Sequence, residues 1–438
     1  DVYKRQSKDK VGFKHRRTKL RYYSHDLVKQ WQLEIAPSFL DAEIDNVSFF
    51  NGRIMVVSSR PIKEGEGLEL YYHFINNTGE MNGNHLLTRF NANRSDREKS
   101  FIVQSASKGV FAVVMNEVKG NDEQTVHFAS FSSDMNLLNN GTIDIPWGPK
   151  QYENRTFSVS EKGDLALLGN QSEKLRSPKK KVFNYLYVAA AGDSVITSNK
   201  ILPNRNVKGI GIAFNNFRDK LVLAGMHTDN RSTTGAAVFY GLFDFRSEKE
   251  PAMVSTLIEA RYNQKLRGER NRNTGIGLAN YNLERIIVLN DGGAVIVSEG
   301  SFTNEYSYYD YFTNTYTQTI EYVFGNIVIM AIAPDGTIIW SNIVEKMQVS
   351  VNDEGSLSSF SHLLNSEEMV VFFNTDISRR NKVVYTTVDK LGELSKPQLL
   401  PTLDGLLLVP RSGRQVSATG YVIPVYNRKK VFLAKIEF

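Results

Sequence analysis

The chain has 438 residues, of which 41% are hydrophobic and 11% aromatic, enough for a large core in one repeat array or in about two to three ordinary domains. It has no cysteine, which excludes disulfides, thiolate metal sites and cysteine nucleophiles. The net charge of +6 comes from the N-terminal tail: residues 1–21 hold nine Lys/Arg and two Asp, a net +7, which leaves −1 for the rest. A body so close to neutral argues against nucleic-acid binding, and no apolar run is long enough for a membrane span.

The N-terminal residues are predicted to lie outside the fold. Asp1–Gln6 resembles the frame translation of an adaptor used in sequencing libraries, so we expect a scar here and a natural N-terminus that is lost. Residues 1–18 as a whole are polar and basic, and they predict a disordered arm. We expect that a signal sequence was lost with the natural N-terminus.

The first element predicted after this arm is a hairpin over residues 20–35. It places Asp26 five residues before Trp31, and Asp335 stands at the same distance before Trp340. This spacing indicates an internal repeat at the level of the hairpin.

A short apolar strand directly after a turn recurs along the chain. It is apolar on both faces, as is typical of a strand inside a stack of sheets. The seven copies cover residues 53–58, 110–115, 164–169, 220–225, 294–299, 369–374 and 421–426.

Residues 280–344 show one whole repeat. Apolar runs rich in β-branched residues are broken by Asp291-Gly292-Gly293 and by Pro334-Asp335-Gly336, which predicts two hairpins and four antiparallel strands. Four strands in a repeat of roughly 50–60 residues, with no convincing amphipathic helix, favour a β-propeller.

We therefore predict an all-β chain in which residues 19–438 form a single β-propeller domain. Seven four-stranded blades are expected, with six and eight as the alternatives. The last repeat ends at Phe438 after three strands, and residues 28–35 are predicted to supply the fourth and to close the ring. A strand at residues 20–24 has no place in this scheme, and an upstream blade is one explanation.

The residues around this repeat also resemble known proteins. Ala333–Gly336, Trp340, Glu345–Gln348 and Asn352–Gly355 are similar to a group of exported propeller-like proteins of Bacteroidota. The pattern of Asp-Gly, two apolar residues and Trp resembles, over one repeat, the propeller repeats of quinoproteins. The first resemblance implies an exported propeller and no particular activity. The second is too short to imply a redox cofactor.

No catalytic or metal motif is present. The seven histidines are scattered without a His-x-His or His-Glu-x-x-His pattern, and there is no Gly-x-Ser-x-Gly elbow. Asp335-Gly336 is predicted to make a hairpin turn and Trp340 to pack between blades. We expect no metal and no cofactor.

The long insertions are predicted to be loops that share one end of the propeller, where binding residues usually lie. Two are basic and one is rich in tyrosine, and Tyr and Arg are favoured anchors of binding. The candidate ligand-binding residues are Lys179, Lys180, Arg267, Arg270, Arg272, Tyr306, Tyr308, Tyr309, Tyr311, Arg379 and Arg380.

The function favoured by these features is a non-enzymatic binding module, exported to the periplasm or the cell surface and monomeric. Its partner is expected to be a glycan, a polyanion or a protein, and not a nucleic acid. The alternative is an enzyme that acts on a polymer such as a glycan, with carboxylates near the central pore. Glu299 and Asp376 are then the candidate catalytic residues, because they lie at or just after the ends of second strands. Glycosidase chemistry needs two carboxylates roughly 5–10 Å apart.

Overall fold

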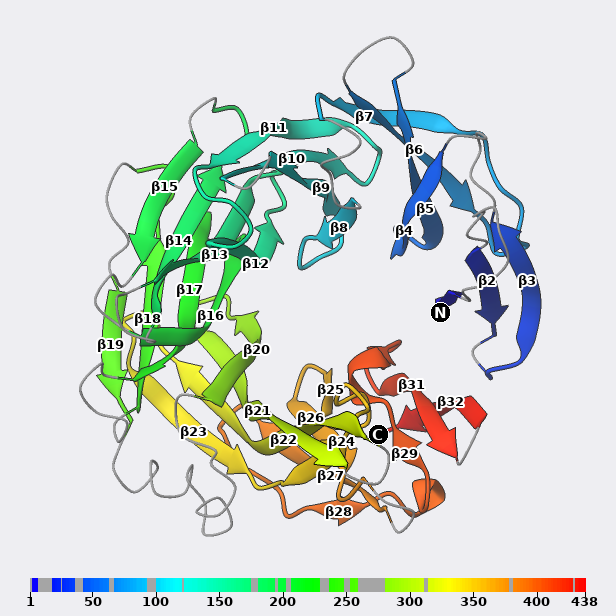
Figure 1. The fold of residues 1–438 in the computed structure, drawn as a ribbon, viewed down its shortest axis with the longest axis vertical. Coiled ribbons are helices and arrows are strands. Elements are labelled where there is room, and N and C mark those ends of the chain that lie inside the picture. Colours follow the sequence, from blue (N-terminus) through cyan, green and yellow to red (C-terminus); the bar gives the residue numbers. More distant parts are fainter. Residues whose placement is uncertain are drawn as a thin grey trace. The chain divides into compact units, whose positions relative to one another are not determined.

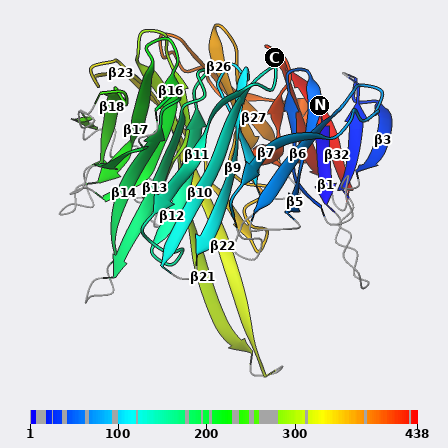
Figure 2. The same cartoon turned by 90° about the horizontal axis from the view of Figure 1, so that it is seen from above.

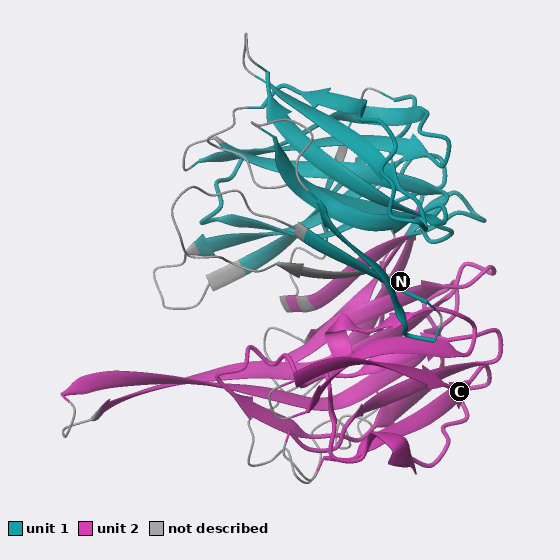
Figure 3. Ribbon diagram, turned by 90° about the vertical axis from the view of Figure 1, so that its right-hand side faces the viewer, with its two compact units in different colours: residues 1–203, 214–221, 244–251 teal, residues 204–213, 222–243, 252–438 magenta. Residues whose placement is uncertain are grey.

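The computed structural model describes residues 2–6, 18–24, 26–35, 42–62, 67–92, 100–119, 122–174, 180–193, 196–201, 206–228, 236–247, 253–258, 280–310, 314–377, 381–427 and 430–438. The chain divides into two compact units (Figure 3). Unit 1 comprises residues 1–203, 214–221 and 244–251, and unit 2 comprises residues 204–213, 222–243 and 252–438. Over the described ranges the regular structure is β-strand with short 3-10 helices, as the composition of the repeats predicts.

Unit 1 contains antiparallel sheets formed by consecutive strands (Figure 1). Their orders are β1-β2-β3, β4-β5-β6-β7, β8-β9-β10-β11 and β12-β13-β14-β15. The strands are β1 (Val2–Gln6), β2 (Thr18–Tyr23), β3 (Lys29–Ile35), β4 (Glu43–Phe50), β5 (Arg53–Pro61), β6 (Leu68–Ile75), β7 (His85–Phe90), β8 (Phe101–Gln104), β9 (Val110–Lys119), β10 (Glu123–Ser132), β11 (Leu137–Ile145), β12 (Tyr152–Val159), β13 (Leu165–Lys174), β14 (Lys180–Ala189) and β15 (Ile196–Ile201).

Unit 2 contains most of the sheet β16-β17-β18-β19 and three further sheets. These are β20-β21-β22-β23 with β24 beside β22, then β25-β26-β27-β28, and a last sheet around β31. The elements are β16 (Asn206–Asn215), β17 (Lys220–Thr228), β18 (Ala236–Phe243), β19 (Met253–Leu257), β20 (Tyr281–Val288), β21 (Ala294–Asp310), β22 (Thr315–Ile332), β23 (Ile338–Val344), β24 (Gln348–Val351), β25 (Ser361–Leu364), β26 (Glu368–Asn374), β27 (Val383–Asp389), β28 (Gln398–Leu399), η3 (Pro401–Leu403), β29 (Leu407–Leu408), η4 (Pro410–Ser412), β30 (Arg414–Gln415), β31 (Gly420–Asn427) and β32 (Lys430–Glu437).

The repeated unit is the four-stranded antiparallel meander, which is the blade of a β-propeller, and the all-β propeller fold class is confirmed. Each of the seven predicted apolar strands is found, as β5, β9, β13, β17, β21, β26 and β31. The predicted hairpins at residues 20–35 and 280–344 are also found. These strands form where the sequence predicts them because β-branched runs and Asp-Gly turns act locally.

The tryptophan repeat has a structural counterpart in both units. In unit 1, Trp31 of β3 donates from Nε1 to Asn77 O at 2.7 Å, and its ring lies against Gly79. In unit 2, Trp340 of β23 donates to Lys390 O at 3.2 Å and lies against Gly392. Each tryptophan therefore packs on the turn that follows the third strand of the next sheet, and this confirms a structural role for Trp340.

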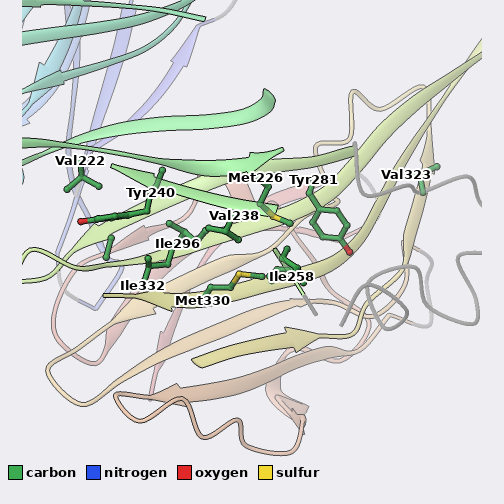
Figure 4. Close-up of a cluster of buried hydrophobic side chains, with 13 residues drawn as sticks. Val222, Met226, Val238, Tyr240, Ile258, Tyr281, Ile296, Val323, Met330 and Ile332 are labelled. Carbon is green, nitrogen blue, oxygen red and sulfur yellow. The ribbon is translucent and has the colours of Figure 1, made fainter. Parts of the chain in front are cut away.

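The core of unit 2 lies between stacked sheets (Figure 4). Val222, Met226 and Val238 from β17 and β18 pack against Ile296 and Met330 from β21 and β22. Burying such side chains contributes about 1.5–3 kcal/mol each. Because both faces of these strands are covered, the sequence is apolar throughout rather than alternating.

Ring closure by residues 28–35 stays a prediction. Within unit 1, β3 pairs with β2. Within unit 2, β32 pairs along the whole of β31, while β29 and β30 pair with parts of the same strand. The last sheet thus has four strands, of which β29 and β30 pair with different parts of β31. The number of blades also stays a prediction.

Candidate functional site

Two contacts between polar or charged side chains start from adjacent residues of β20 in unit 2. Arg285 on β20 reaches His362 on β25, with 2.6 Å between Nη1 and Nε2. Its neighbour Glu284 lies 3.8 Å from Arg411 of η4, measured from Oε1 to Nη2. We call Glu284, Arg285, His362 and Arg411 the first-strand cluster.

A β-bulge on β20 positions two members of this cluster. Leu283 is the partner of Ser298 and Arg285 is the partner of Val297, so Glu284 is the extra residue between them. Bulges redirect side chains and are common beside functional sites. The bulge lets two adjacent charged residues occur in a strand that is otherwise apolar.

A buried ion pair lies next to the cluster. Lys346 Nζ is 2.7 Å from Glu299 Oε1, and the two side chains are 1% and 0% exposed. Ser359 Oγ donates to the other carboxylate oxygen of Glu299 at 2.6 Å, and Lys346 also donates to Gln348 Oε1 at 3.0 Å. The charge of Glu299 is therefore matched inside the protein.

The ion pair influences Glu284 electrostatically. Burial raises the pKa of Glu284, and the negative charge of Glu299 raises it further, while Arg411 and Lys346 act in the opposite direction. The side chain of Glu284 is nevertheless 30% exposed. Glu284 is thus a solvent-accessible carboxyl group that accepts a proton more readily than an ordinary glutamate.

His362 is neutral at physiological pH. Burial lowers the pKa of His362 to about 4, and the nearby guanidinium of Arg285 contributes to the shift. Nε2 then carries a lone pair and accepts the hydrogen bond from Arg285. Burial also lowers the pKa of Arg285 from its ordinary value.

The tyrosine-rich segment forms a second candidate site. It was predicted to be a loop, and that prediction is wrong: β21 and β22 continue through it as a long hairpin that projects from unit 2 (Figures 2 and 3). The pairing runs without interruption from Ser301 with Phe324 to Asp310 with Thr315. We call residues 301–324 the tyrosine arm. Thr and Tyr favour strands, and the alternating pairs across the arm sustain the ladder.

The tyrosines of the arm lie on both faces. Tyr306 and Tyr308 share one face, and they are 53% and 57% exposed. Tyr316 is 80% exposed and contacts Tyr309 on the other face, with 4.9 Å between ring centroids. The arm contains Glu305, Asp310 and Glu321 and no Lys or Arg, so it carries a negative charge.

Most of the basic candidates lie outside the described residues: these are Lys179, Arg267, Arg270, Arg272, Arg379 and Arg380, together with Tyr311. Lys180 begins β14 in unit 1, and no position is described for its side chain. The role of these residues in binding stays a prediction.

The two carboxylates proposed for the alternative enzyme have different surroundings. Glu299 is fully buried in its ion pair, a position that does not favour direct contact with a polymer. Asp376 is exposed just after β26. Their catalytic role stays a prediction.

The described residues contain no group of three or more His, Asp or Glu side chains placed to hold a metal ion. A histidine meets an acid in unit 1, where His127 Nε2 lies 2.8 Å from Glu117 Oε2. The same described ranges contain no helix long and apolar enough to cross a membrane.

The first-strand cluster was missed from the sequence. The available signal was Glu284-Arg285, two adjacent charges inside an apolar strand, which interrupts the alternation and indicates a bulge. Nothing local in the sequence connects these residues with His362 or Arg411.

No protein-family model and no curated protein matches the chain. Among solved structures, it is similar to the WD40 domain of SCAP from fission yeast, with a TM-score of 0.37 and 10% identity over 97% of this chain and 90% of that one. It is similar to the β-propeller domain of the trilobed protease from Pyrococcus furiosus, with a TM-score of 0.35 and 10% identity over 87% and 86% of the two chains. It is also similar to the polysaccharide lyase Uly1, with a TM-score of 0.36 and 9% identity over 90% of both. These values are too low to transfer a function or a residue role to this chain.

Proposed function

We propose that the protein is a non-enzymatic interaction module that binds a protein partner through the tyrosine arm. The observation that carries this proposal is the exposure of Tyr306, Tyr308 and Tyr316 on a projecting ribbon of two strands. A two-stranded ribbon has no core of its own and is marginally stable in water. Three large rings on such a ribbon offer apolar area that a partner can cover.

The composition of the tyrosine arm supports a protein as the partner. Tyrosine supplies large contact area at low entropic cost, and Ser, Thr and Asn supply adaptable hydrogen bonds, a combination that is typical of binding loops. The arm carries three acidic side chains and no basic one. Charge complementarity therefore favours a partner with a basic surface and disfavours a polyanion at this position.

The test compares wild type with a variant that carries Tyr306→Ala and Tyr308→Ala. Both are applied to arrays of basic, acidic and neutral peptides and of glycans. We expect basic peptides to bind wild type and to bind the variant at least about tenfold more weakly. A matched control carries Phe49→Ala and Phe217→Ala, which remove aromatic rings that are 50% and 75% exposed elsewhere. If the arrays do not separate the tyrosine variant from this control, the proposal fails.

We also propose that the protein is exported and that it is a monomer. The support for export is the sequence resemblance to exported propeller-like proteins. Light scattering on the purified chain would check the oligomeric state, and a constant mass of one chain over a range of concentrations is expected.

A second candidate function is an enzyme that acts on a polymer, and Glu284 favours it. This carboxyl group is partly exposed and its pKa is raised by burial and by Glu299, as a general acid requires. Incubation with a panel of polysaccharides would show shortened products from wild type and none from Glu284→Gln. If wild type shortens no polymer, this candidate is rejected.

A further inference from the structure

Arg285 has no carboxylate partner among the described residues. Arg285 is exposed on β20, and among the described residues its guanidinium has one hydrogen-bond partner, the neutral His362. No acidic side chain in the described part of the chain forms an ion pair with it. A guanidinium has five N–H donors, so most of them remain available.

Two further arginines lie in η4 and β30 of unit 2. Arg411 is 52% exposed and lies 3.8 Å from Glu284, while Arg414 donates to the carbonyls of Arg411 and Gly413. Burial raises the pKa of Tyr421, while a hydrogen bond with Ser361 and the charges of Arg414 and Arg285 oppose this rise.

Two acidic side chains of the same sheet are paired with other groups. Glu284, the neighbour of Arg285 in the chain, lies 3.8 Å from Arg411. Glu299 is held by Lys346 and Ser359. Arg285 therefore keeps its positive charge without an acidic partner among the described residues.

We infer that Arg285, oriented by His362, binds an oxyanion group of an acidic ligand at the first-strand cluster. Carboxylate and sulfate share the geometry that a guanidinium recognises through two parallel N–H donors. His362 holds one Nη1 proton and leaves the other donors to the ligand. Arg411 of the cluster lies 5.2 Å from the ring centroid of Phe324, at the base of the tyrosine arm. The inference does not depend on the function proposed for the arm.

Arginine is better suited to this role than lysine. Its fork fixes the direction of the oxyanion, whereas an ammonium group acts as a point charge. The surrounding protein atoms partly desolvate the exposed Arg285 and lower its pKa, so its charged form lacks part of the solvation it has in water. A bound anion would replace that solvation.

The test is calorimetric titration of the whole chain at pH 7.5 and low salt. The probes are trigalacturonate, which carries carboxylates, a sulfated disaccharide, inorganic sulfate, and cellotriose as the neutral control. We expect trigalacturonate or the sulfated disaccharide to bind wild type and cellotriose not to bind. Comparing the first two identifies which oxyanion the site prefers, and binding of inorganic sulfate alone would mean that no specific ligand is recognised and would overturn the inference.

Substitutions of Arg285 test whether this residue binds the oxyanion. Arg285→Gln should weaken binding by at least about tenfold, and Arg285→Lys by less, because the charge remains but the fork is lost. Lys390→Gln removes the same charge from an exposed site in unit 2 and should leave the affinity within about twofold. Unchanged affinity of Arg285→Gln, or no binding of any oxyanion probe to wild type, would overturn the inference.

A measurement on wild type covers the case in which Arg285→Gln does not fold. Phenylglyoxal modifies accessible arginines, and peptide mass spectrometry reports the extent at each one. The binding probe should protect Arg285 at least about threefold more than Arg218, which lies in unit 1. Equal protection of the two residues contradicts the proposed site.

Discussion

Lys346 Nζ lies 2.7 Å from Glu299 Oε1, and neither side chain has more than 1% of its surface exposed. The pair joins β21 to the segment that precedes β24, beside the base of the tyrosine arm. A buried ion pair adds little net stability over an apolar pair of the same size, but removing one partner leaves an uncompensated charge. The two residues should therefore behave as one unit.

Substitution of one partner tests this coupling. Lys346→Met should lower the free energy of unfolding by about 3–5 kcal/mol, because Glu299 is then buried without its counter-ion. The double variant Glu299→Gln with Lys346→Met should lose clearly less than the sum of the single variants. Chemical denaturation measures all three. Lys390→Met is the control, since Lys390 and Glu367 are 64% and 77% exposed; a similar loss there would contradict the assignment.

The neutral state of His362 predicts a pH dependence of stability. Its folded pKa, about 4, is below the ordinary value of 6.5, so the unfolded chain binds more protons between these values. Stability from this group is complete above about pH 6.5 and decreases as the pH falls towards 4. Thermal melts between pH 7 and pH 4 should therefore fall more steeply for wild type than for His362→Gln. Parallel curves for the two proteins would refute this.

The turn beneath Trp340 requires glycine for two reasons. Gly392 has φ of +84°, and a Cβ atom there would lie 2.5 Å from the indole. Gly192 has φ of +81° and open space around its Cβ position. Gly392→Ala should therefore cost more than Gly192→Ala, by about 1–3 kcal/mol, because only the first adds a clash to the backbone strain. Equal losses in thermal denaturation would show that Trp340 moves aside freely.

Shortening the tyrosine arm separates binding from folding. Glu305 and Ile320 are partners in the hairpin, so an Asn-Gly turn can replace residues 306–319 and keep the ladder below it. The hydrogen bond from Ile320 N to Asn352 Oδ1 remains. We expect the melting temperature to change by less than about 3 °C, with binding of basic peptides lost. A larger fall would mean that the arm stabilises the body of unit 2.

The sequence by itself determined the strands and turns of the repeat, because these depend on neighbours in the chain. β-Branched runs and Asp-Gly pairs act over a few residues, and the spacing of Asp335 and Trp340 repeats that of Asp26 and Trp31. The same local signals were present in the tyrosine arm. Its polar composition suggested a loop, but unbroken pairing with the opposite strand makes it a hairpin.

Only the tertiary structure decided which charges meet. Arg285 and His362 are 77 residues apart in the chain. Glu299 lies on β21, and Lys346 lies in the connection between β23 and β24. Whether these side chains meet depends on how the sheets stack and, for Arg285, on the bulge at Glu284. Contacts between residues so far apart in the chain do not affect the local strand and turn propensities from which the elements were predicted. Glu299 was a catalytic candidate of the alternative enzyme because it lies at the end of a second strand. Its partner Lys346 and its complete burial follow from packing alone.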